Sequence, residues 1–252
     1  MHNKERIMTR SIMAVVLVTV IGAPCSFAQA VVEPRRIDEE HRPIVERLRP
    51  DDRHVILVSA TTEPAWGDPG DRFVEEIVNT NPVIVVGRIV EKRPVFLNLR
   101  MRRRYTFASL DQANWIGSRL TLLVDRVIQT IDELPLAPGE RLTFVEDGDG
   151  SAVINGVRVD AETPWLWPVE MGRRYLITGR LETNRFVATG MWMEPPAGGN
   201  MRANVTRARS GRTPGELGPF RSPVASPFDD WSIEEASFFL EQEIQRRGAG
   251  RR

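Results

Sequence analysis

Two tryptophans, Trp165 and Trp167, are the residues of this sequence whose type and spacing best suit a ligand site. In an extended chain, side chains two positions apart point to the same side, so both rings would share one face. Pro164 and Pro168 bracket them, which favours a rigid loop or a sheet edge over a paired strand. Such a face could stack on a sugar. The two rings could instead fill the hydrophobic core. That interpretation is favoured, because a domain without disulfides needs such burial.

A second candidate surface is the segment 99–107, in which four arginines precede two aromatic residues. Arginines and aromatic rings on one face of a β-barrel can hold single nucleic-acid strands or sugars. A solvated loop between two strands explains the same residues and is the favoured interpretation, because runs of charge are usually exposed. The candidate binding residues in this segment are Arg102, Arg103, Arg104 and Tyr105.

Residue sets that could perform catalysis are sparse. His41 and His54 are the only histidines beyond residue 30, and no G-x-S-x-G motif places a serine on a sharp turn. Carboxylate pairs such as Asp132 and Glu133 could assist hydrolysis, but nothing in the sequence brings two carboxyl groups to one site. The stretch 146–151 lacks the glycine and glutamate spacing of a calcium loop. We therefore expect no enzymatic activity, no metal and no cofactor.

The first thirty residues have the features of a signal peptide. A basic start precedes an apolar run over 12–23, and Ala28-Gln29-Ala30 supplies small residues where a signal peptidase cleaves. The run is shorter than the ~20 residues of a membrane-spanning helix. Cys25 raises the alternative of a lipidated terminus, but the Gly-Ala-Pro before it is a poor match. We expect cleavage near Ala30, export to the periplasm or the extracellular space, and no transmembrane span in the mature chain.

Composition narrows the range of partners. The only cysteine is Cys25, so a chain cleaved near Ala30 would contain none, which excludes disulfides, thiol catalysis and cysteine-bound zinc. The 34 basic and 34 acidic residues balance. A nucleic-acid-binding protein usually concentrates basic charge on one domain, and no segment here does so strongly. We expect no nucleic-acid partner.

Short strands dominate the region from 71 to 194. The run from Val83 to Val90 is nearly continuous in valine and isoleucine, and Gly87 in its middle predicts a bulge or a bend. Asn155-Gly156 between apolar pairs predicts a two-residue hairpin turn. With a short helix before them and no helical crossovers, these strands predict a mainly β fold, a small closed antiparallel barrel or a compact sandwich. The closed barrel is the expectation carried forward.

Two short motifs carry a family resemblance. The stretches Val86–Ile89 and Gly172–Leu176 resemble the first and a late strand of the netrin-like, tissue-inhibitor-of-metalloproteinase-like OB barrels of secreted proteins. The resemblance covers about residues 71–193 and implies an OB-like barrel. Inhibitors of that family depend on an N-terminal cysteine and on disulfides. Both are missing here, so metalloproteinase inhibition is not implied.

Segments on either side of the barrel complete the predicted organisation. Residues 31–70 read as an irregular N-terminal segment, within which the apolar, β-branched run 54–60 predicts a strand or an extended segment laid on the main domain. Residues 195–230 are rich in proline, glycine, serine and arginine, which predicts a flexible linker. Residues 231–252 predict an amphipathic helix that starts with a Ser232–Glu235 capping box and carries one apolar stripe. The members of that stripe are Ile233, Ala236, Leu240 and Ile244.

The sequence as a whole predicts an exported, non-enzymatic β-barrel module that binds a protein or an envelope component of unknown identity. Phe238, Phe239 and Leu240 broaden the apolar face of the C-terminal helix, which suggests a partner contact or self-association. Two alternatives stay open. One is a glycan-binding domain that uses Trp165, Trp167 and the Arg100–Arg104 loop, and the other is a hydrolase of unfamiliar type.

Overall fold

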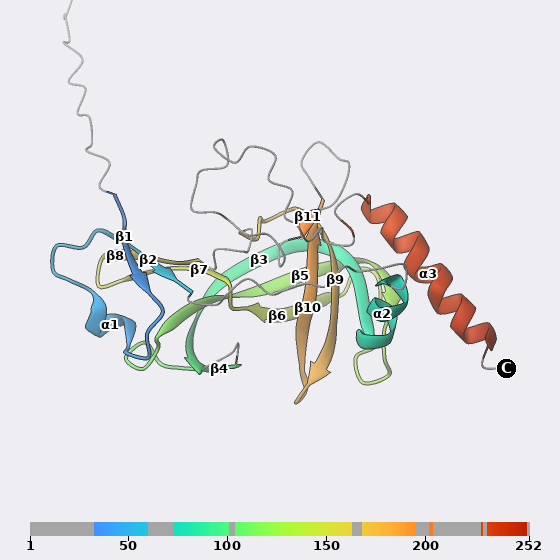
Figure 1. Cartoon of the computed structure of the whole chain (residues 1–252), viewed down its shortest axis with the longest axis horizontal. Coiled ribbons are helices and arrows are strands. Elements are labelled where there is room, and N and C mark those ends of the chain that lie inside the picture. Colours follow the sequence, from blue (N-terminus) through green and yellow to red (C-terminus); the bar gives the residue numbers. More distant parts are fainter. Residues whose placement is uncertain are drawn as a thin grey trace, which may run out of the picture. The chain divides into compact units, whose positions relative to one another are not determined.

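The computed structural model describes residues 33–59, 73–100, 104–162, 168–194, 202–203, 228 and 231–250 (Figure 1). The predicted signal peptide lies outside the described residues, as does most of the predicted linker. In chain order the elements are β1 (Arg35–Asp38), α1 (Ile44–Arg47), β2 (His54–Val58), α2 (Phe73–Thr80), β3 (Val83–Arg100), β4 (Arg104–Phe107), β5 (Trp115–Gln129), β6 (Arg141–Glu146), β7 (Asp149–Ile154), β8 (Val157–Glu162), β9 (Arg174–Glu182), β10 (Arg185–Met193), β11 (Arg202–Ala203) and α3 (Ile233–Gly250).

The larger sheet is antiparallel and has the order β11-β10-β9-β3-β5-β6, with β4 paired to the far half of β3. Strand β3 is long enough to pair with β5 over most of its length and with β9 from Val83 to Arg88. Its register against β5 shifts between Val86 and Gly87, which confirms the bulge predicted at that glycine. At Gly87 a side chain would collide with the backbone of Leu123, so the close approach of the two strands requires glycine there.

The smaller sheet has the order β1-β2-β8-β7 (Figure 1). Strand β2 pairs in parallel with both β1 and β8, and only β7 and β8 form a hairpin. The hairpin turn is the predicted one, because Asn155 (φ 51°) and Gly156 (φ 80°) both take positive φ. The run 54–60, predicted as a strand or an extended segment, contains β2, whereas β1 lies in a part of the N-terminal segment that was expected to be irregular. The boundary predicted at residue 71 cuts through this sheet.

The prediction of a closed barrel is wrong. Neither sheet closes on itself in the parts of the chain that the structure describes. The hairpin at 149–162 was expected to belong to the barrel. Its strand β8 pairs with β2 of the smaller sheet instead. Strands β6 and β10 contact each other through side chains, with the rings of Phe144 and Phe186 5.8 Å apart, and no ladder joins them.

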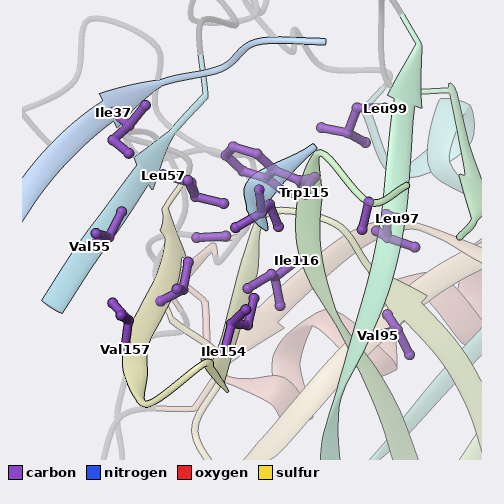
Figure 2. Packing of buried hydrophobic residues seen from close by; sticks show 14 residues of the cluster. Ile37, Val55, Leu57, Val95, Leu97, Leu99, Trp115, Ile116, Ile154 and Val157 are labelled. Carbon is purple, nitrogen blue, oxygen red and sulfur yellow. The ribbon is translucent and has the colours of Figure 1, made fainter. Parts of the chain in front are cut away.

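Trp115 lies at the centre of the cluster that joins the two sheets (Figure 2). Its ring is fully buried, and its indole N–H donates to the carbonyl of Asp147 at 2.5 Å. Leu57 from β2, Leu97 from β3 and Ile154 from β7 belong to the same cluster (Figure 2). Burial of this ring with apolar partners from both sheets supplies the contact that a disulfide supplies in many small exported domains.

Two further clusters pack on opposite faces of the larger sheet. Along β5, Leu120, Leu122 and Val124 alternate with more exposed residues and pack into the face that also holds Phe144 and Phe186. The other face carries Ile84, Val86, Leu176 and Trp192, which pack against α2, α3 and Phe228. Trp192 is buried under these two helices.

Candidate functional site

Several residues predicted to form a site cannot be placed. Trp165, Trp167, Arg102 and Arg103 lie outside the described residues. Arg104 begins β4, and its backbone pairs with Arg100 of β3, but its side chain is not described. The predicted tryptophan surface and most of the predicted arginine loop therefore stay predictions.

Tyr105 is the one candidate binding residue of the segment 99–107 whose side chain is described. It is half-buried against the Trp115 cluster, and its ring meets that of Phe107 edge-on at 6.1 Å. Burial raises the pKa of Tyr105 above its usual value, and the nearby carboxylates of Asp147 and Glu146 raise it further. Its hydroxyl therefore stays protonated at neutral pH, so it suits packing or hydrogen bonding rather than proton abstraction.

His54 forms a polar network with two residues of the β7–β8 hairpin. Its Nε2 lies 2.7 Å from Oδ2 of Asp160, and the hydroxyl of Ser151 donates to Oδ1 of the same carboxylate at 2.5 Å. Burial alone would raise the pKa of Asp160. Hydrogen bonds from Ser151, Arg158 and His54 outweigh that effect and hold the pKa below its usual value.

This network does not have the geometry of a serine nucleophile and its base. Catalysis of that type requires a hydrogen bond between the histidine and the serine hydroxyl, with the carboxylate on the far side of the imidazole. Here the carboxylate of Asp160 lies between them and accepts from both. The contacts join β2 to β8 and β8 to β7, so the network fixes the register of the smaller sheet.

A pocket of about 270 Å³ opens beside this network. Lys92 reaches into it from β3 and donates to Oδ2 of Asp149 at 2.6 Å, and the same oxygen accepts from the backbone N–H of Val169 at 2.9 Å. Arg158, which also lines the pocket, donates to Asp160 at 3.0 Å. Each cation of the pocket already has a carboxylate partner, so an incoming ligand would have to displace an ion pair.

The C-terminal helix α3 docks on its own sheet. The predicted stripe is buried there: Ile233, Ala236 and Leu240 are almost completely covered, and Ile244 packs at the edge of the same cluster. The capping box is confirmed, because Ser232 and Glu235 exchange hydrogen bonds of 2.8 Å and 3.2 Å at the helix start. Leu240, which was expected to serve a partner contact, is not accessible to one.

Three arginines fix the ends and the middle of α3 to the rest of the chain. Arg174 donates to Glu234 at 2.9 Å, and this hydrogen bond lowers the pKa of the Glu234 carboxyl group. Arg126 holds Glu241 with two hydrogen bonds of 2.9 Å and 2.6 Å. Near the C-terminus, Arg247 donates to the carbonyl of Glu75 in α2 at 2.8 Å. The helix is therefore held by polar contacts along its whole length as well as by its apolar stripe.

Aromatic side chains remain on the opposite side of α3. Phe238 is 54% exposed and Phe239 is 44% exposed. The two rings lie 5.6 Å apart, and Phe239 also lies 4.9 Å from the half-buried ring of Trp231. We call Trp231, Phe238 and Phe239 the α3 aromatic face. Trp231 was missed by sequence reasoning, although its place directly before the capping box puts it within reach of the first helical turn.

The described residues hold no group of three or more histidine, cysteine, aspartate or glutamate side chains that could bind a metal ion. None of the described helices combines the length and the apolar character needed to cross a bilayer. No protein-family model, no curated protein and no solved structure matches this chain.

Proposed function

We propose that this chain is an exported, non-enzymatic module that binds a protein through the α3 aromatic face. The observation that carries the proposal is the exposure of Phe238 and Phe239 on a helix whose other side is already buried. A helix that only covers its own sheet needs apolar residues on one stripe, and its outer side is usually polar. Exposed aromatic residues that lie together are typical of the centre of a protein interface.

The docking of α3 favours this function energetically. An isolated helix of this length is only marginally stable in water, so a free helix would pay an ordering penalty on binding. Here the contacts of Arg174, Arg126 and Arg247 already hold the helix in place. The α3 aromatic face is therefore presented as a rigid surface, and a partner would not have to order it.

The charge beside the α3 aromatic face indicates which kind of partner surface would be complementary to it. The carboxylate of Glu235, on the same exposed side of the helix, accepts hydrogen bonds from Ser232 and makes no ion pair with a described residue. A partner that fits would present an apolar pocket for the two phenylalanines and a basic residue at its rim.

Site-specific crosslinking in cells that express the full chain tests this function. A photoreactive benzophenone amino acid would replace Phe239 in one variant and Val153 in the control variant. Val153 is also apolar and is 74% exposed, but it lies on the smaller sheet. We expect one discrete crosslinked product from position 239 and none from position 153. A product of twice the chain mass would identify the partner as a second copy. Equal labelling from both positions would contradict the proposal.

A further inference from the structure

Phe107 is an exposed aromatic residue at the end of an edge strand. It closes β4, which pairs with β3 on one side, and no other described strand lies on the opposite side of β4. Its ring is 41% exposed although it lies directly across from Leu97, which is completely buried. The residue is thus only partly covered, although its ring also meets that of Tyr105 edge-on.

Two arginines from other strands converge on this ring. The guanidinium carbon of Arg185, at the start of β10, lies 4.9 Å from the ring centroid, and that of Arg119, in β5, lies 5.7 Å from it. Both distances fall within the range of a cation–π contact. Three separate strands thus place two positive charges on one ring, and we call these three residues the Phe107 site.

Neither guanidinium of the Phe107 site makes an ion pair or a hydrogen bond with any residue that the structure describes. The contrast with nearby side chains is clear. Glu182 lies opposite Arg185 in the hairpin register, yet it binds Arg180 at 2.6 Å. A ring holds a guanidinium in place without using its N–H donors, so Arg119 and Arg185 keep those donors for a ligand.

The neighbourhood of Arg119 adds further positive charge. Arg93 of β3 is its direct cross-strand partner, and like charges in that position destabilise a sheet. Arg93 has one carboxylate partner, Glu91, which it does not share with Arg119. An anion bound between the guanidiniums would relieve this repulsion.

We propose that the Phe107 site binds the carboxylates of an extended acidic peptide segment. The planar fork of a guanidinium matches a carboxylate with two parallel hydrogen bonds. A peptide laid along the open side of β4 would gain backbone hydrogen bonds, and its alternate side chains would point to the same face. A sugar stacks on a free aromatic face, and the guanidiniums over Phe107 occupy that position, so the geometry favours the peptide over a polyuronate.

The test is a titration of the full chain with a fluorescein-labelled peptide of alternating glutamate and serine, followed by fluorescence anisotropy at low salt. R119Q and R185Q should each weaken binding about 10-fold, because each removes a charge-assisted hydrogen-bonding group. R141Q is the matched control, since Arg141 is exposed on β6 and makes no ion pair with a described residue. Binding should also weaken as salt is raised.

A second measurement on the unmodified chain does not depend on the variants. Phenylglyoxal modifies accessible arginines, and the bound peptide should protect Arg119 and Arg185 but leave Arg141 reactive. A labelled polyuronate of equal charge is the competing ligand. Tighter binding of the polyuronate, equal effects of R119Q, R185Q and R141Q, or equal protection of all three arginines would each overturn the proposal. None of these results depends on Phe238 or Phe239, so the partner contact of α3 is judged separately.

Discussion

The arginines around the smaller sheet and the arginines of the Phe107 site are the same residue type in opposite circumstances. Arg35 holds Asp52 with two hydrogen bonds of 2.8 Å and 2.5 Å. Arg47 is buried, and its terminal nitrogens donate to the carbonyls of Asp38 and Asn114. At the Phe107 site, by contrast, the guanidiniums rest on a ring and make no polar contact with the described residues.

The difference separates charges that hold the fold from charges that remain for a ligand. A guanidinium whose donors are used by the protein stabilises a particular packing, and its removal leaves its acceptors unsatisfied. A guanidinium held by an aromatic ring is fixed in position while its donors face outward. Secondary structure alone does not distinguish the two groups, because Arg35, Arg119 and Arg185 all lie on β-strands. What distinguishes them is whether the guanidinium donates hydrogen bonds to an acceptor on a described residue.

The strongest test of this comparison is Arg47→Ala. The change removes the donors of two backbone carbonyls and leaves a void beside the Trp115 cluster, so the free energy of unfolding should fall by about 3 kcal/mol. Arg47→Met keeps most of the volume and should lose roughly half as much. Arg49→Ala, at an exposed neighbouring position, is the control. Urea denaturation gives these values, and equal values for positions 47 and 49 would break the comparison.

Asp149→Ala tests the pocket next to the smaller sheet. The side chain of Asp149 is 19% exposed and accepts from Lys92 and from the backbone of Val169. Its loss leaves both donors without this acceptor, and we expect a decrease of about 2 kcal/mol in the free energy of unfolding. Asp132→Ala, at an exposed position, should change it by less than about 0.5 kcal/mol. A loss at position 149 no larger than at 132 would show that the ion pair is not structural.

Asp52→Asn tests how the stability contributed by the Arg35–Asp52 pair depends on pH. The hydrogen bond from Arg35 lowers the pKa of Asp52 to about 2, against about 3.9 in an unfolded chain. Because the folded pKa is the lower one, the stabilisation is fully present above about pH 4 and is lost as the pH falls towards 2. The variant should lose roughly 1–2 kcal/mol at pH 7 and show a flatter decline between pH 4 and 2. Thermal unfolding at a series of pH values measures this, and parallel curves for the two chains would contradict it.

Arg119→Gln and Arg185→Gln should have the smallest effect on stability. Each removes one exposed cation–π contact and no ion pair with a described residue, so the free energy of unfolding should change by less than about 0.5 kcal/mol. Denaturation of these variants beside Asp149→Ala gives the comparison directly. A loss as large as that of Asp149→Ala would place these arginines among the structural ones.

Local features of the fold could be predicted from the sequence because short-range chemistry determines them. Positive φ at Asn155 and Gly156 follows from the residue types, and the Ser232–Glu235 capping box follows from their spacing. The closed barrel was wrong because strand pairing is a long-range choice. The apolar alternation of β8 fits a barrel or a sheet with β2 equally well, and only tertiary packing selects β2.

The candidate sites show the same limit. Helical periodicity identified the stripe that buries Leu240, but it could not show that Phe238 and Phe239 would stay exposed once the helix had docked. Arg119 and Arg185 were missed for a different reason. Their relation to Phe107 arises from three strands that meet only in the folded chain, and each arginine alone reads as an ordinary surface residue.

The parallel pairing of β2 with β8 has a consequence for the order of folding. Residue 54 finds its partner at residue 158, about a hundred positions later, and a contact of that separation is slow to form because a long loop must close first. Until β8 has been synthesised, the apolar strand His54–Val58 has no β8 to join. During that interval the edge of β2 that later pairs with β8 is open to wrong pairing.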